Sequence, residues 1–198
     1  MSPRENHRER LLRGALKCLY ENGYAHTTSR DIAAASGSSL GSIGYHFGSK
    51  EQLLNAAIRE GCSEWTDQLR QLAFADEGAT PADRLRASWL ALTDTFEEHR
   101  QLLVAFVELH TQAERSPELR DYLAEIYNES RAAVARMVNA ALSDLEIGED
   151  HMRAITSLLI AAHNGLLLQW LVDPQTTPSG PQLIDGLQSI LPAALTLK

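Results

Sequence analysis

Apolar residues recur along most of this chain at the three- and four-residue spacing of amphipathic α-helices. No segment shows the sustained period-two alternation that indicates a strand, so we predict an all-α fold. Short segments rich in Gly, Pro or Ser separate the periodic stretches. Outside residues 27–54, helices are expected at residues 5–22, 82–98, 100–113, 117–144, 150–172 and 181–197.

Residues 27–54 contain the signals of two short helices joined by a tight turn. Thr28 is suited to cap the first helix, and Asp31 supplies the acid of a capping box three residues later. Gly37 is suited to end this helix, because glycine adopts left-handed backbone angles without steric cost. A helix, a turn of about three residues with a glycine, and a second helix are typical of the helix-turn-helix motif.

The second helix of this motif is predicted for residues 40–47, with Ser39 as its cap. It has few large apolar side chains and therefore cannot be buried on all sides. Gly41 and Gly44 each lower its helix propensity by about 1 kcal/mol relative to alanine. Small residues let a backbone approach another surface closely, which favours a DNA-reading helix over the alternative, a plain helical hairpin within a bundle.

Two longer helices complete this part of the chain. The apolar stripe of residues 5–22 is expected to close a three-helix head over Ile32, Ile43 and Phe47. Ser49 with Gln52 forms another capping box, which opens a helix that continues past Trp65 to about Ala73. This long helix is expected to connect the head to the rest of the chain.

The run GSSLGSIGYHFGSKEQLL, residues 37–54, resembles the recognition helix and following segment of the TetR/AcrR family of transcriptional regulators. The close likeness covers about residues 8–60. Beyond it only length and helical pattern agree. The residues that fit the family pattern are Gly37, Ser39, Gly41, Ser42, Ile43, Tyr45, His46, Phe47, Ser49, Lys50 and Glu51.

This resemblance implies a helix-turn-helix DNA-binding domain at residues 1–50 and a helical-bundle domain for ligand binding and dimerisation at residues 51–198. It also implies a regulator, most often a repressor, that binds a palindromic operator as a dimer and is released by a small organic effector. An activator, or a helix-turn-helix protein without a small ligand, is the alternative.

The charge distribution agrees with a DNA-binding head. The chain carries a net charge of −8, but residues 1–50 hold seven Lys or Arg against four acidic residues. This gives +3 for the head and leaves −11 for residues 51–198. A basic head on an acidic body is expected when one end meets phosphates. Because the excess is small, neutral donors and helix N-termini are expected to share in binding.

The head supplies most candidate DNA contacts, with phosphates holding the register and base edges giving specificity. Arg30 can reach guanine bidentately, and Leu40 can meet a thymine methyl group. Leu40 and Gly44 depart from the family pattern, which often has a polar residue and an aromatic residue there. The expected DNA-binding residues are Thr28, Ser29, Arg30, Ser39, Leu40, Gly41, Ser42, Gly44, Tyr45, His46 and Lys50.

Several of these residues have ordinary structural alternatives. Thr28 is suited to a capping role alone, and Tyr45 and His46 to packing in the core. Arg30 and Lys50 are also the kind of residues that form surface salt bridges or remain solvated.

The segment at residues 154–172 is apolar on nearly every face. The segment is long enough to span a membrane. Polar residues interrupt it, however, and Pro174 follows directly, so we predict no membrane segment. An apolar helix of this kind needs cover on both sides. With the stripe of the last helix, it predicts a homodimer formed through the last two helices. Burial within its own domain is the alternative.

The body contains aromatic and polar side chains suited to an organic effector. Aromatic residues on helices usually belong to a core, so each has a packing alternative. His163 and Asn164 stand out because they are polar in the middle of an apolar helix, where an unpaired polar group is costly. The candidate ligand-binding residues are Trp89, Phe96, Phe106, His110, Tyr122, Tyr127, Met137, His163 and Trp170.

Other chemistry has little support in the sequence. No His-Glu-x-x-His or Glu-x-x-His motif occurs, so we expect no metal site, no cofactor and no enzyme. Cys18 and Cys62 lack metal-ligand spacing and are expected to be free thiols, with a redox pair as an unsupported alternative. An N-terminal signal-peptide pattern is absent, and a cytoplasmic location is therefore expected.

Overall fold

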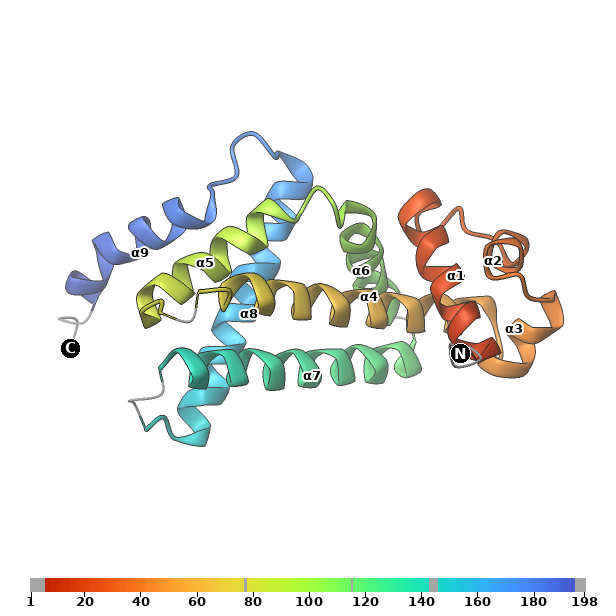
Figure 1. The fold of residues 1–198 in the computed structure, drawn as a ribbon, viewed down its shortest axis with the longest axis horizontal. Helices are drawn as coiled ribbons and strands as arrows, with labels where there is room; N and C mark the ends of the chain where they lie inside the picture. The colour runs from red at the N-terminus through yellow and green to blue at the C-terminus, as the bar shows by residue number, and fades with distance from the viewer. Residues whose placement is uncertain (1–5, 77, 115, 143–145, 195–198) are drawn as a thin grey trace. The chain divides into compact units, whose positions relative to one another are not determined.

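The all-α prediction is confirmed by the structure, a computed structural model that describes residues 6–76, 78–114, 116–142 and 146–194 (Figure 1). The described residues form nine helices and no strand. The helices are α1 (His7–Asn22), α2 (Ser29–Ser36), α3 (Leu40–Phe47), α4 (Lys50–Ala73), α5 (Pro81–Asp94), α6 (Arg100–Ala113), α7 (Pro117–Ala141), α8 (Glu149–Val172) and α9 (Gly180–Ala194).

The predicted helix at residues 82–98 is wrong at its end, since α5 stops at Asp94 and turns follow. At this end, the amide and the hydroxyl of Thr95 both donate to the carbonyl of Ala91, at 3.2 and 2.8 Å. The other predicted limits agree closely with the observed ones. The predicted ends at residues 144 and 197 lie outside the described residues.

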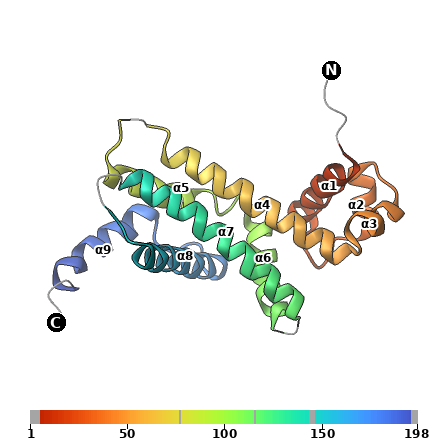
Figure 2. The ribbon, with the colours of Figure 1, turned by 90° about the horizontal axis from the view of Figure 1, so that it is seen from below.

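The first of two compact units consists of the described residues up to Trp65 together with His99–Ile126. It contains α1, α2, α3, α6 and the first parts of α4 and α7. Figure 2 shows the helices α1, α2 and α3 grouped at the start of α4. One apolar core joins these helices, with Leu11, Ile32 and Leu54 fully buried. The head therefore shares its core with helices that follow it in the sequence.

A glycine sets the spacing between α1 and α2. A Cβ atom at Gly14 would lie 2.8 Å from the Cβ of Ser36, which is too close for ordinary packing. The two helices therefore approach closely at this point, and the predicted closure over Ile32 and Ile43 is confirmed by their burial.

The second unit consists of Thr66–Glu98 and the described residues from Tyr127 onwards. In it α9 packs on α5: a Cβ at Gly180 would overlap the backbone of Trp89, and Arg86 pairs with Asp185 at 2.9 Å. Helices α4 and α7 each run from one unit into the other. The predicted division at residue 50 concerns function and remains a prediction.

Candidate nucleic-acid interface

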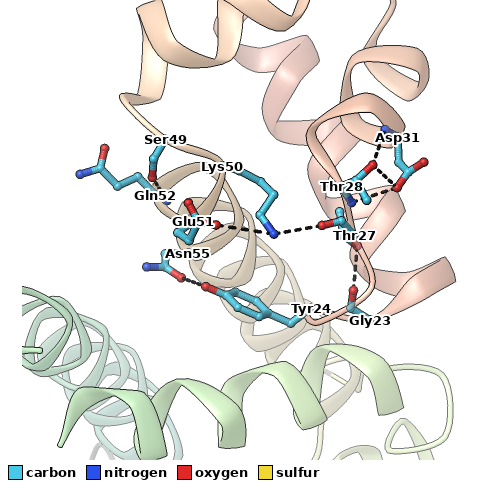
Figure 3. Close-up of polar contacts among 10 residues, drawn as sticks. All are labelled: Gly23, Tyr24, Thr27, Thr28, Asp31, Ser49, Lys50, Glu51, Gln52 and Asn55. Carbon is cyan, nitrogen blue, oxygen red and sulfur yellow. Dashed lines mark hydrogen bonds and ion pairs between the residues drawn. The ribbon is translucent and has the colours of Figure 1, made fainter. Parts of the chain in front are cut away.

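The predicted capping box at the start of α2 is confirmed (Figure 3). The Asp31 amide donates to Thr28 Oγ1 at 3.2 Å, while the Thr28 amide and hydroxyl donate to Asp31 Oδ2 at 2.9 and 2.6 Å. These hydrogen bonds lower the pKa of the Asp31 carboxyl below its usual value. The Thr28 side chain thus caps the helix at the exposed edge of the head.

The turn between α2 and α3 forms as predicted. Gly37 has φ = 59°, in the left-handed region, and the Ser38 amide donates to the Ala33 carbonyl at 3.0 Å. Ser39 caps α3, because its Oγ accepts from the Ser42 amide at 3.3 Å and lies 2.8 Å from the Ser42 hydroxyl. The helix-turn-helix geometry therefore arises from short-range hydrogen bonds.

One face of α3 packs on the head and the other faces outward. Ile43 is buried in the core, and the guanidinium of Arg8 lies 4.9 Å above the ring of Phe47. On the outer face, the Leu40 side chain is 51% exposed and the Tyr45 side chain is 85% exposed. The core alternative for Tyr45 is therefore wrong.

Neither glycine of α3 is required by packing within the chain. A Cβ at Gly44 would meet no atom within 4 Å, and one at Gly41 would meet only Ser39 Oγ at 3.9 Å. Both positions reduce helix propensity without easing an internal contact. The outer face of α3 therefore has room for close approach by a partner outside this chain.

Lys50 already has a structural role. Its Nζ donates to the Thr27 carbonyl at 3.2 Å and lies 3.6 Å from Glu51 Oε1 (Figure 3). The Thr27 hydroxyl donates in turn to the carbonyls of Gly23 and Cys18, at 2.7 and 3.1 Å. Lys50 thus fastens the start of α4 to the turn before α2, and its predicted phosphate contact remains a prediction.

The other candidate DNA residues lie on the same two helices. Ser29 begins α2 and is half-buried, and Arg30 is exposed. His46 is half-buried, with its ring 4.8 Å from that of Tyr45 in an edge-to-face contact. Because α3 contains no carboxylate, its exposed face carries no charge that repels phosphate.

The candidate ligand residues divide between the two units, and their contacts join residues within each. In the first unit, Phe106 meets His110 edge to face at 4.6 Å. In the second, Phe96 is fully buried, and the centre of its ring lies 5.3 Å from that of Trp170 and 6.3 Å from that of His163. The remaining candidates are half-buried Tyr122 in the first unit, and buried Trp89 with half-buried Tyr127 and Met137 in the second.

His163 and Asn164, the polar residues in the middle of α8, are uncharged in this setting. Asn164 Nδ2 donates to the Tyr127 hydroxyl at 2.9 Å, and burial raises the pKa of Tyr127. Burial lowers the pKa of His163 to about 4, so its imidazole is uncharged at pH 7. The second unit therefore combines aromatic rings with uncharged hydrogen-bonding groups.

Neither Cys18 nor Cys62 is part of a disulfide, in agreement with the prediction. Cys18 is buried and Cys62 is half-buried, and burial raises the pKa of the Cys62 thiol to about 12. Across the described ranges, no group of three or more His, Cys, Asp or Glu is placed to hold a metal ion.

Sequence reasoning missed the contacts of Asn55. Its Oδ1 accepts from the Tyr24 hydroxyl at 3.1 Å, close to the Lys50 contact (Figure 3). The available signal was weak: a polar residue next to Leu54 in a helix whose neighbouring positions are apolar.

Two family models together match most of the chain. The model of bacterial regulatory proteins of the tetR family matches residues 11–57, and the C-terminal model of BetI-type transcriptional repressors matches residues 81–191. The first match contains the helix-turn-helix described above, and the second covers more than half of the chain.

Individual relatives agree with these matches. The transcriptional repressor AcnR of Corynebacterium efficiens is 33% identical over 88 residues, which are 44% of this chain and 47% of AcnR. The matching stretch thus spans less than half of that relative. The transcriptional regulator UidR of Escherichia coli K12 is 28% identical over 193 residues, 96% of this chain and 93% of UidR.

A solved structure extends the likeness to the fold. Salmonella enterica GusR superposes with a TM-score of 0.59 and 31% sequence identity, over 81% of each chain. Together with the two family models, this shows that the chain belongs to the TetR family of transcriptional regulators.

Proposed function

We propose that this protein is a ligand-responsive repressor that binds a roughly palindromic DNA operator as a homodimer. The observation that carries the proposal is the outer face of α3, where Leu40 and Tyr45 are exposed and Gly41 and Gly44 leave open space. A helix with this face, held by caps and packed on one side, suits insertion into the major groove.

In this proposal α3 reads bases and its surroundings bind phosphates. Leu40 meets a thymine methyl group, and Arg30 on α2 reaches a guanine edge. Ser42 and Tyr45 offer hydroxyl groups to phosphates, and the amides in the first turns of the two helices offer N–H groups. The Thr28 hydroxyl reaches a phosphate only when it gives up its bond to Asp31 Oδ2. Because few of these contacts are charged, operator affinity is expected to depend only moderately on salt.

Dimerisation is proposed through α8 and α9. Leu158 and Val172 of α8 are 70% and 87% exposed, and Leu187 of α9 is also exposed. A Cβ at Gly165 would meet no atom within 4 Å, so a second helix has room to approach α8 there. Burial of these side chains by a second copy would remove a large apolar surface from water. The predicted apolar stripe of α9 continues beyond residue 189, where the structure does not describe the side chains.

The same surface bears on the membrane question. Within the described residues, α8 is long and apolar enough to span a membrane, with a mean hydropathy of 1.5 over its best window and 22% of that window buried. One such helix is weak evidence for a span, and a dimer contact accounts equally for its uncovered face. We propose that the protein acts in the cytoplasm.

The effector is proposed to be a small organic molecule that binds among the aromatic rings and lowers operator affinity. Support comes from Phe96, Trp170 and the uncharged polar groups of His163, Asn164 and Tyr127. Repression is favoured because AcnR is named a repressor and the C-terminal match is to BetI-type repressors. An activator, or a DNA-binding protein without an effector, remains the alternative.

The proposal is tested by selecting duplexes from a random library with the purified protein. We expect enrichment of inverted repeats, a loss of affinity in Tyr45→Ala, and a changed base preference within each half-site in Leu40→Lys. Tyr45 and Leu40 are exposed, so both variants should keep the stability of the wild type. Absence of any enriched sequence at low salt would contradict DNA binding, and an unchanged motif in Leu40→Lys would remove Leu40 from base reading.

An effector is then sought by screening organic compounds for thermal stabilisation of the protein. A compound that stabilises the fold is expected to release the selected duplex. Stabilising compounds that leave DNA affinity unchanged would favour the alternative without an effector.

A further inference from the structure

Arg8, in the first turn of α1, lies against the last residue of the recognition helix. Its guanidinium carbon Cζ is 4.9 Å from the centre of the Phe47 ring. Arg8 is exposed and Phe47 is half-buried, so the charged group lies over a ring that itself packs on the core. Both residues belong to the first compact unit. Helix α1 thus brings a cation to the C-terminal end of α3.

This contact holds the guanidinium in place without using its hydrogen-bond donors. A cation above an aromatic ring is attracted by the negative face of the ring. The N–H groups of a guanidinium form a planar fork that matches the oxygens of a phosphate. The Phe47 ring therefore positions Arg8 and leaves its donors available to an anion outside the chain.

The recognition helix needs a cation from elsewhere, because it contains no Lys or Arg. His46 is its one residue that can carry a positive charge. The last carbonyl groups of a helix carry a partial negative charge, which disfavours a phosphate at this end. Lys50, the next cation along the chain, is already bonded to Thr27 and lies beside Glu51. Arg8 contacts α3 directly and can offset the charge of its C-terminal end.

The charge of Arg8 is not used within the described part of the chain, where no carboxylate forms an ion pair with it. Its neighbour Glu9 belongs to the capping box of α1, in which Oε2 accepts from the Asn6 amide at 3.4 Å. Lys17, farther along α1, is different because it pairs with Glu21 at 3.8 Å. Arg8 therefore keeps its charge for a partner of opposite sign.

The position of Arg8 along α3 suits the edge of a DNA groove. A recognition helix contacts base edges mainly with its N-terminal residues, which in α3 begin at Leu40. A helix of eight residues is about 12 Å long, and the major groove is about 12 Å wide. With Leu40 among the bases, the opposite end at Phe47 lies toward the phosphates that border the groove.

From these observations we propose that Arg8 binds a DNA backbone phosphate beside the C-terminal end of α3 and that the Phe47 ring positions its guanidinium. This inference rests on the proposed function, because it adds one phosphate contact to each head of the operator complex. Phosphate contacts carry no sequence information but make binding depend on salt. Loss of this contact should therefore change the salt dependence and leave the preferred sequence unchanged.

The test measures the affinity of the full-length protein for its selected duplex at a series of salt concentrations. Arg8→Gln removes the charge and keeps a polar side chain. Arg13→Gln is the matched control, because Arg13 is exposed on the same helix and its charge interacts with Glu64 of α4. Phe47→Leu keeps an apolar side chain and removes the ring.

In Arg8→Gln, affinity at low salt should fall about tenfold or more, as expected for a hydrogen bond to a charged group. The slope of log K against log salt concentration should become shallower by about two, since each of the two heads loses one phosphate contact. Arg13→Gln should keep the wild-type slope. In the Phe47→Leu background, Arg8→Gln should reduce affinity less than in the wild type, because the guanidinium is no longer held in place.

An unchanged salt slope in Arg8→Gln would overturn the inference while leaving the proposed function intact, and so would an equal change in Arg13→Gln. A purely structural role for Arg8 would lower stability without altering the slope. A changed sequence preference in Arg8→Gln would show base reading and also overturn it.

Equal effects of Arg8→Gln in the wild-type and Phe47→Leu backgrounds would overturn the positioning role of the ring. If Phe47→Leu does not fold, the comparison of Arg8→Gln with Arg13→Gln decides. A wild type that binds no duplex at all would instead contradict the proposed function.

Discussion

At the scale of single residues, two glycines of the head differ in what they contribute to the fold. Gly14 is needed within the chain, because a side chain there would collide with Ser36. Gly44 has open space around it and still reduces the stability of its helix. A residue that is unfavourable for folding and unnecessary for packing is expected at a functional surface.

Substituting Gly44 by alanine should therefore raise stability and reduce DNA binding. We expect the free energy of unfolding to increase by about 0.5–1 kcal/mol, measured by urea denaturation. The added methyl group should keep α3 from approaching the groove closely, and operator affinity should fall. Gly14→Ala serves as the control, with a loss of stability. An operator affinity of Gly44→Ala equal to that of the wild type would rule out close approach at this position.

His163 predicts a pH dependence of stability. Its folded pKa of about 4 lies below the unfolded value of 6.5, so between these values the unfolded state binds more protons. The free energy of unfolding should therefore fall as the pH is lowered from 6.5 to 4, by on the order of 3 kcal/mol at most. Denaturation curves across this range measure the effect.

The control for this prediction is His163→Phe, which should lack that pH dependence. Three aspartates have pKa values below their ordinary value of 3.8, namely Asp31, Asp83 and Asp173. Their contribution to the free energy of unfolding is therefore lost only below the pH range in which His163 acts. An identical slope between pH 6.5 and 4 in His163→Phe and the wild type would show that His163 is accessible to protons in the folded state.

At the scale of helices, most limits were predictable because they depend on residues close in sequence. Thr28, Gly37 and Ser39 act through contacts with residues three or four positions away, and all appear in the structure as predicted. The end of α5 was predicted four residues too late, because neither Gly nor Pro marks it in the sequence.

Two chemically identical caps allow function to be separated from stability. Thr28 caps α2 and Thr80 caps α5, each through a capping box with an aspartate three residues later. Thr28→Ala and Thr80→Ala should each lower the free energy of unfolding by about 1 kcal/mol. Only Thr28→Ala should also weaken operator binding beyond this loss, as measured by fluorescence anisotropy. Equal affinities of the two variants would show that Thr28 serves the fold alone.

At the scale of the whole chain, the sequence carried less information. The contact of Tyr122 with Asn55 joins residues 67 positions apart, and no local pattern in either segment announces it. Lys50 was predicted as a phosphate ligand from its place at a helix start, but its bond to Thr27 depends on how the head packs on α4. Local signals thus predicted the reading helices, whereas the residues that hold them in place emerged only from tertiary structure.

The central claim is that two copies of the chain present their recognition helices to one operator. The mass of the complex between the protein and a selected duplex, measured by light scattering coupled to size-exclusion chromatography, tests it most directly. The account predicts two chains on each inverted repeat and a large loss of affinity when one half-site is scrambled. A single chain per duplex, with full affinity for one half-site, would contradict it.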